Sequence, residues 1–189
     1  DNLDRRILAI VIFLPTVGLI GLLAWAMFQA KGTPGGFGIN NEFGPVAVVE
    51  RPAPSMTLPL LSGDNLFMTD LTGKIVMLDF WSSWCAPCIA EAATLADVYS
   101  DYSSRGVEFV GIAIWDEPEA VLDHVARFAV PYPNGHDDMG RIAIDYGVRG
   151  MPEKFFIDRD GTLIEKHVGP ASEEALRSIL DRLLKDANG

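Results

Sequence analysis

The chain has 189 residues, of which 49% are hydrophobic and 22% charged, and its formal net charge is −11 at pH 7. This length allows one domain with a smaller additional segment, and the composition fits a globular protein that carries an extra apolar stretch. The acidic balance argues against nucleic acid and anionic lipid surfaces as partners, because both would be repelled.

The extra apolar stretch lies near the N-terminus, where the 22 residues from Ile7 to Phe28 carry no charge. As a helix this stretch would be about 33 Å long, enough to cross a hydrocarbon core of ~30 Å. We predict that residues 1–31 form a cytoplasmic tip and an uncleaved transmembrane anchor. A cleaved signal peptide and a buried core helix are the alternatives.

Charges on either side of this stretch predict its orientation. Arg5 and Arg6 precede it, and only Lys31 follows it closely. The positive-inside tendency then places the N-terminus in the cytoplasm and everything after residue 31 outside. We therefore expect a single-pass membrane protein whose main domain is extracytoplasmic, in a periplasm or on the outer face.

Residues 32–55 contain five glycines and four prolines, which is the composition of a flexible linker. Within it, residues 46–50 could equally form a short edge strand. The domain proper is predicted to follow, over residues 56–189.

Apolar patterning in residues 56–189 alternates between strand and helix periods. Buried strands are expected at 74–81 and 107–115, and a hairpin about Ser62-Gly63-Asp64 precedes them. The predicted elements, in chain order, are strands at 56–61, 65–71 and 74–81, a helix at 89–106, a strand at 107–115, helices at 118–130 and 139–147, two strands within 154–169 and a helix at 173–186. This order indicates a three-layer α/β domain.

The helix predicted at 118–130 is expected to have an apolar side that carries Val121, Leu122, Val125 and Phe128. The three histidines, His124, His136 and His167, are too dispersed in the sequence to indicate a site.

The only two cysteines, Cys85 and Cys88, fall where a buried strand ends and a helix begins. A helix N-terminus stabilises a thiolate, and Pro87 suits the first helical turn because its missing N–H would have had no partner. One sulfur can attack a disulfide and the other, one turn on, can resolve the mixed disulfide. The pair is therefore predicted to be a redox switch.

The cysteine pair has three alternative roles. A structural disulfide that closes so short a loop would stabilise by only ~2 kcal/mol. Zinc requires four ligands, and no second cysteine pair accompanies these two. Two inert buried thiols are the third alternative.

The segment Val76–Cys88, VMLDFWSSWCAPC, resembles the active-site strand and turn of thioredoxins, and Gly147–Glu153 with Phe155–Asp158 resembles their second signature. The branch it resembles most is that of membrane-anchored TlpA/ResA/CcmG-type thiol-disulfide oxidoreductases. The likeness covers roughly residues 50–186, including a β-α insert around Trp115–Tyr132. It implies a thioredoxin fold, in which helices flank a central mixed sheet, with an N-terminal β-hairpin and this insert.

The resemblance assigns roles to individual residues. It implies that Cys85 is the nucleophile, Cys88 the resolving thiol and Pro152 a cis-proline facing the disulfide. Asp79 would help to move the proton of Cys88, or would instead pair with a nearby lysine. An ordinary turn proline is the alternative for Pro152.

Two further residues would support the site. Glu153 would tune the thiols, or be an exposed charge at a strand end, and Trp84 would cover the disulfide, or simply pack. Glu91 matches an acid of this branch, although a solvated helix face is an equal interpretation. Lys154 departs from the family, because a threonine is common at this position.

We therefore expect an extracytoplasmic thiol-disulfide oxidoreductase that reduces cysteine pairs of an apocytochrome c or another metalloprotein. It would need a membrane electron donor, but no metal and no cofactor beyond the redox-active disulfide. A disulfide-forming oxidase on the same fold is one alternative. A Cu(I)-binding chaperone that uses Cys85, Cys88 and Met151 as soft ligands is another.

Overall fold

The computed structural model describes residues 2–29, 38–39, 44–46 and 48–187. The chain divides into two compact units, which are residues 1–38 and residues 39–189. Part of the predicted linker, namely 32–37, 40–43 and 47, lies outside the described residues.

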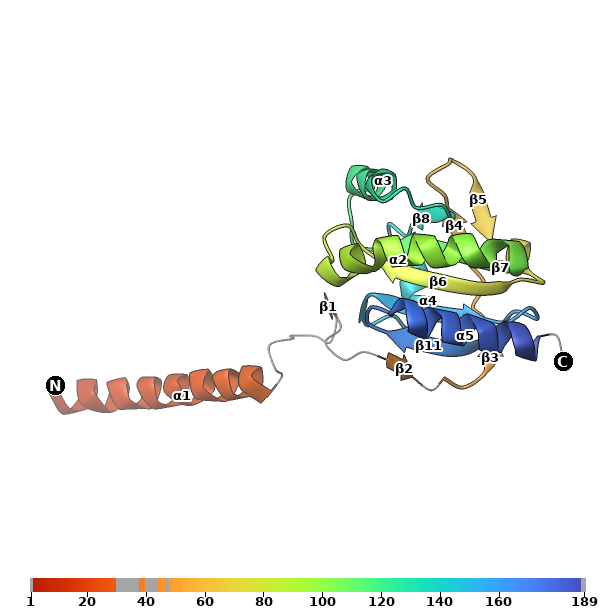
Figure 1. Ribbon diagram of the computed structural model, residues 1–189. Helices are drawn as coiled ribbons and strands as arrows, with labels where there is room; N and C mark the ends of the chain where they lie inside the picture. Colours follow the sequence, from red (N-terminus) through yellow and green to blue (C-terminus); the bar gives the residue numbers. More distant parts are fainter. Residues whose placement is uncertain (1, 30–37, 40–43, 47, 188–189) are drawn as a thin grey trace. The chain divides into compact units, whose positions relative to one another are not determined.

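The first unit contains one helix, α1 (Asn2–Gln29), with Pro15 inside it (Figure 1). The side chains of residues 7–12 and 26–28, within the predicted anchor, lie outside the described residues. In the part of the chain that the structure describes, no helix has the length and apolar character needed to cross a membrane. The anchor at 7–28 stays a prediction.

The second unit alternates strands and helices. Its helices are α2 (Ala86–Tyr102), α3 (Pro118–Arg127), α4 (Arg141–Tyr146) and α5 (Glu173–Asp186), with 3-10 turns η1 (Met68–Leu71) and η2 (Ser103–Arg105). The strands are β1 (Gly38–Ile39), β2 (Gly44–Val46), β3 (Arg51–Pro52), β4 (Thr57–Pro59), β5 (Asn65–Phe67), β6 (Ile75–Trp81), β7 (Val107–Ala113), β8 (Asn134–His136), β9 (Gly150–Met151), β10 (Glu153–Ile157) and β11 (Thr162–Val168).

A mixed sheet of seven strands forms the centre of this unit, in the order β2-β11-β10-β6-β7-β8, with β3 also paired to β11. Strand β6 runs parallel to β7 and antiparallel to β10, and β7 runs parallel to β8. Strands β4 and β5 form a separate N-terminal hairpin, as predicted from the turn sequence Ser62-Gly63-Asp64. The predicted mixed sheet, hairpin and α/β class are therefore confirmed.

Two apolar clusters cover the two faces of the sheet, because alternate residues of each strand point to opposite faces. Ile75 and Met77 of β6 pack with α2 and α5, while Val76, Leu78 and Phe80 pack with α4 and with Val121 of α3. Figure 1 shows α2 and α5 lying together over one face of the sheet. All seven residues of β6 are buried, as the apolar run predicted.

Two sequence predictions need correction in the insert. Leu122 is 49% exposed and His124 is only 8% exposed, so the buried side of α3 carries the histidine in place of the leucine. His124 lies three after Val121 and four before Phe128, so it neighbours both on the helix, whereas Leu122 has this spacing only to Val125. Strand β8, with the sequence Asn134-Gly135-His136, was not predicted, because three residues without apolar alternation carry no strand pattern.

Candidate active site

Cys85 and Cys88 lie at the junction between β6 and α2 and form a disulfide, with their Cα atoms 5.2 Å apart. Cys85 is the N-cap residue of α2, and its Sγ accepts a hydrogen bond from the Cys88 N–H at 3.4 Å. Pro87 occupies the first turn, as predicted. The cysteine pair thus lies at a helix N-terminus, where free N–H groups and the helix dipole stabilise a thiolate.

Both cysteines are buried, with Cys85 0% and Cys88 3% exposed. Trp84 beside them is 51% exposed, so it does not pack in the core, and its Nε1–H donates to the Trp115 carbonyl at 2.9 Å. A partner that reacts with Cys85 must therefore displace the groups that cover the sulfur.

The peptide bond between Met151 and Pro152 is cis, as expected for Pro152. That Pro152 faces the disulfide stays a prediction. Met151 is fully buried, and its sulfur accepts a hydrogen bond from the Ser82 hydroxyl at 2.9 Å. Because Ser82 lies between β6 and the cysteines, this contact connects the proline loop to the active-site turn.

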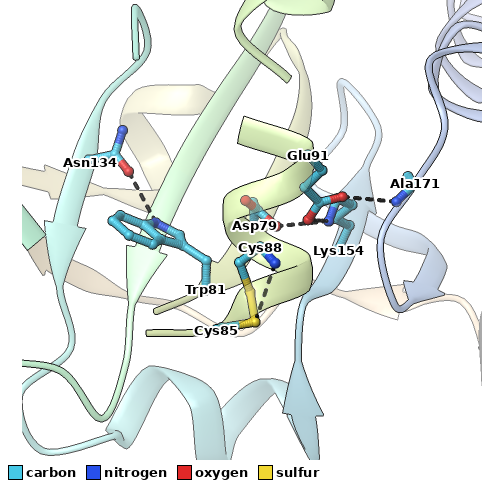
Figure 2. A network of polar contacts seen from close by, with 8 residues as sticks. All are labelled: Asp79, Trp81, Cys85, Cys88, Glu91, Asn134, Lys154 and Ala171. Atoms are coloured by element: carbon cyan, nitrogen blue, oxygen red, sulfur yellow. Dashed lines mark hydrogen bonds and ion pairs between the residues drawn. A yellow bond between two sulfur atoms is a disulfide. The ribbon is translucent and has the colours of Figure 1, made fainter. Parts of the chain in front are cut away.

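A buried polar network lies behind the disulfide (Figure 2). The Lys154 ammonium donates to Glu91 Oε1 at 2.6 Å and lies 3.1 Å from Asp79 Oδ1. Glu91 Oε2 accepts from the backbone N–H of Ala171 at 2.9 Å. Asp79, Glu91 and Lys154 are each no more than 5% exposed. The site therefore holds two buried carboxylates that share one ammonium.

This network follows from strand register and helix spacing. Lys154 of β10 is the direct cross-strand partner of Asp79 on β6, so both side chains point to the sheet face that α2 covers. Glu91 follows Cys88 by three positions on α2, which puts both residues on one side of the helix. The lysine alternative for Asp79 is therefore what the structure shows, and the solvated-face interpretation of Glu91 is wrong.

Burial and neighbouring charges shift the proton affinities in this network. Burial raises the pKa of Glu91 from 4.5 to about 7, although the nearby Lys154 ammonium opposes the rise. Burial alone would lower the pKa of Lys154, but Asp79 and Glu91 together outweigh it and raise that pKa. Glu91 can therefore exchange a proton near neutral pH.

Comparison with known proteins agrees with this geometry. The model of the AhpC/TSA family matches residues 49–166. The chain belongs to this family. Among curated relatives, the thiol-disulfide oxidoreductase ResA of Bacillus anthracis is 28% identical over 95% of this chain and 97% of its own length. The thiol:disulfide interchange protein HelX of Rhodobacter capsulatus is 30% identical over 92% of this chain and 95% of its own.

Comparison with solved structures gives the same result. A putative thiol:disulfide interchange protein DsbE from Chlorobium tepidum is 30% identical, with a TM-score of 0.69 over 74% of this chain and 99% of its own. A secreted disulfide oxidoreductase of Mycobacterium tuberculosis is 31% identical, with a TM-score of 0.62 over 68% of this chain and 96% of its own. The chain is thus a thiol-disulfide oxidoreductase of the ResA, HelX and DsbE type, and the predicted resemblance is confirmed.

Glu153, the other acid predicted for this oxidoreductase site, is 1% exposed, so its alternative as an exposed charge is wrong. Its Oε2 lies 2.6 Å from the Lys166 ammonium, and its Oε1 accepts from the Arg149 N–H at 3.3 Å. Glu153 is adjacent to the cis-proline, so this ion pair anchors the start of β10 beside that proline.

Two groups near the disulfide were not predicted as parts of the site. The sequence singles out Lys154 only as a departure from the family. Its position opposite Asp79 on the neighbouring strand is the feature that could have identified the ion pair. His124 lies with Cys88 and Asp79 in the lining of one cavity, although the histidines looked too dispersed to form a site. Its burial on α3, three positions after Val121, was the available indication.

Proposed function

We propose that this oxidoreductase reduces cysteine pairs of an apocytochrome c or another metalloprotein on the outer side of the cytoplasmic membrane, held there by an anchor at 7–28. The observation that carries the proposal is the Cys85–Cys88 disulfide at the start of α2, backed by two buried carboxylates. A dedicated reductant has a use in a compartment that otherwise keeps thiols oxidised.

The exchange takes two steps. The Cys85 thiolate, stabilised at the helix N-terminus, attacks one sulfur of the substrate disulfide, and the other substrate sulfur leaves as a thiolate that takes a proton from water. Cys88 then gives its proton to the Asp79 and Glu91 pair and attacks Cys85 Sγ. The second substrate sulfur leaves as a thiolate, and the oxidised Cys85–Cys88 disulfide remains.

A dithiol donor must then return two electrons to the Cys85–Cys88 disulfide. We propose that this donor is a membrane protein, because an anchor that holds both partners at one membrane raises their effective concentration. Pro152 would face the disulfide, where its neighbours would pair with the backbone of the substrate, and Glu153 would tune the thiols from the same loop.

The reduction potential of the Cys85–Cys88 couple in the full chain tests this direction of electron flow. Equilibration in a series of glutathione or dithiothreitol buffers, with a Cys88→Ser variant as the non-cycling control, gives the value. A potential near or below about −220 mV supports a reductant. A potential near about −120 mV contradicts it and favours a disulfide-forming oxidase.

A further inference from the structure

A small cavity lies directly behind Cys88, bordered by Asp79, Trp81, Asn134 and His124. The volume that the centre of a water molecule can occupy in it is about 10 Å³, which is room for roughly one water. Its border carries one carboxylate, one imidazole and the Cys88 sulfur among mostly apolar side chains. A water there would take its hydrogen-bond partners from these polar groups.

His124 enters this border from α3, the helix of the insert. Its ring packs on the Trp81 ring at 4.3 Å between centroids and on the Phe128 ring at 4.7 Å. Trp81 is in turn fixed, because its Nε1–H donates to Asn134 Oδ1 at 3.2 Å. The imidazole is thus held in one place at the edge of the cavity, at 8% exposure.

The charge state of His124 suits proton exchange. Burial lowers its pKa, while Asp116 and Asp79 act to raise it and Arg127 acts to lower it. The ring is therefore neutral at neutral pH, with one nitrogen free to accept a proton and the other able to donate one.

The reaction creates a need for such a group. Cys88 must lose a proton in the resolving step, yet Cys88, Asp79 and Glu91 are all nearly inaccessible to solvent. Because the pKa of Glu91 is raised to about 7, the pair already holds a proton in part of the molecules at neutral pH, and that proton must leave before the pair can accept the one from Cys88. His124 lines the cavity and is, at 8%, the most exposed of these four residues, so it is the group best placed to pass the proton to solvent.

We propose that His124 carries the Cys88 proton from the buried carboxylates to solvent through one water in this cavity. This inference rests on the proposed exchange reaction. In the resolving step the Cys88 S–H bond breaks, its proton passes to a carboxylate, then through the water to the neutral imidazole. The imidazole releases a proton to bulk water, while the Cys88 sulfur forms the bond to Cys85 Sγ.

The test follows the mixed disulfide in the full chain with a peptide that carries an intramolecular disulfide, using acid quench and mass spectrometry. We expect His124→Phe, which keeps the ring stack, to slow resolution about tenfold or more at pH 7, so that the mixed disulfide accumulates. The reduction potential should stay that of the wild type, because a relay changes rates and not equilibria.

Control variants make the test specific. His136→Phe makes the same change outside the border of this cavity and should resolve at the wild-type rate. His124→Gly should be slow, and added imidazole should restore its rate. If His124→Phe does not fold, His124→Gln keeps a polar side chain that cannot take up the proton.

Two results would overturn the relay: wild-type resolution in the His124 variants, or slow resolution together with a shifted reduction potential. Failure of the wild-type chain to reduce the peptide would instead contradict the proposed function. The two inferences therefore fail on different observations.

Discussion

Lys154 and Glu91 lie 63 positions apart in the chain, yet the Lys154 ammonium donates to Glu91 Oε1 at 2.6 Å in a site that solvent does not reach. Asp79 lies 3.1 Å from the same ammonium, so two carboxylates compete for one positive charge. Burial disfavours the remaining net negative charge. A proton bound to the carboxylate pair removes that charge, which is why the pair can act as the acid and base for Cys88.

The first prediction concerns Lys154→Met. Loss of the ammonium should raise the pKa of Glu91 above about 7, because the opposite charge that held it down is gone. The carboxylate pair then stays protonated at neutral pH and cannot accept the Cys88 proton. We expect the rate of disulfide reduction at pH 7 to fall about tenfold and to recover at higher pH. The pH profile of peptide reduction measures this.

Stability separates this effect from simple disruption of the fold. The double variant Glu91→Gln with Lys154→Met has one carboxylate and no ammonium, so its buried net charge equals that of the wild type with both acids ionised. It should regain most of the free energy of unfolding that Lys154→Met loses. An unshifted pH profile in Lys154→Met would exclude the lysine from setting the proton affinity.

The second prediction concerns the pH dependence of stability. The pKa of Glu91 is raised from 4.5 to about 7 in the folded state, so between these values the folded chain binds a proton that the unfolded chain has released. The free energy of unfolding therefore falls as pH rises through this window, by roughly 3 kcal/mol, and the loss is complete above about pH 7.

Glu91→Gln should lack this fall. Urea unfolding of the variant and the wild type at several pH values between 4.5 and 8 measures the difference, which should move in favour of the variant as pH rises. Glu174→Gln, an exposed change on α5, serves as the matched control and should follow the wild type. Parallel curves for Glu91→Gln and the wild type would refute the raised pKa.

The sequence predicts those elements whose formation depends on a pattern in neighbouring residues. The apolar run of β6, the turn at Ser62-Gly63-Asp64 and the glycine after η2 each carry their own pattern. Gly106, for example, ends that segment at a φ of 84°, a left-handed conformation that favours glycine. The cysteine pair is equally local, because its spacing and its place before α2 can be read directly from the chain.

The polar network depends on contacts between distant segments. Lys154 meets Asp79 only because β10 pairs with β6 in one particular register, and a shift by one residue would turn Lys154 to the other face. His124 reaches the cavity only because α3 packs beside Trp81. Periodicity identifies a buried side of α3, but it does not identify which part of the sheet that side covers.

The third prediction concerns the ion pair beside the cis-proline. Lys166→Met leaves the Glu153 carboxylate, 1% exposed, without the ammonium that lies 2.6 Å away. An uncompensated buried charge costs about 3–5 kcal/mol, and urea unfolding should show a loss of this size. Glu153→Gln with Lys166→Met should recover most of it. A single variant within about 1 kcal/mol of the wild type would show that water compensates the charge.

The fourth prediction concerns Gly111 on β7, which lies under the hydrogen bond between Trp81 and Asn134. A Cβ at this position would lie 1.9 Å from Asn134 Oδ1 and 2.9 Å from Trp81 Nε1, so one of these buried groups must move. Gly111→Ala should therefore destabilise the fold by about 1–3 kcal/mol from overpacking, with about 1 kcal/mol more for the lost hydrogen bond.

Asn134→Ala removes the atoms that a Cβ on residue 111 would meet most closely, so it provides the control for this substitution. The double variant Gly111→Ala with Asn134→Ala should be more stable than Gly111→Ala alone, because the clash is relieved while the unpaired indole N–H remains. Urea unfolding measures both, and near-ultraviolet circular dichroism reports the indole environment. If the two substitutions simply add, the contact between residues 111 and 134 is not the cause of the loss.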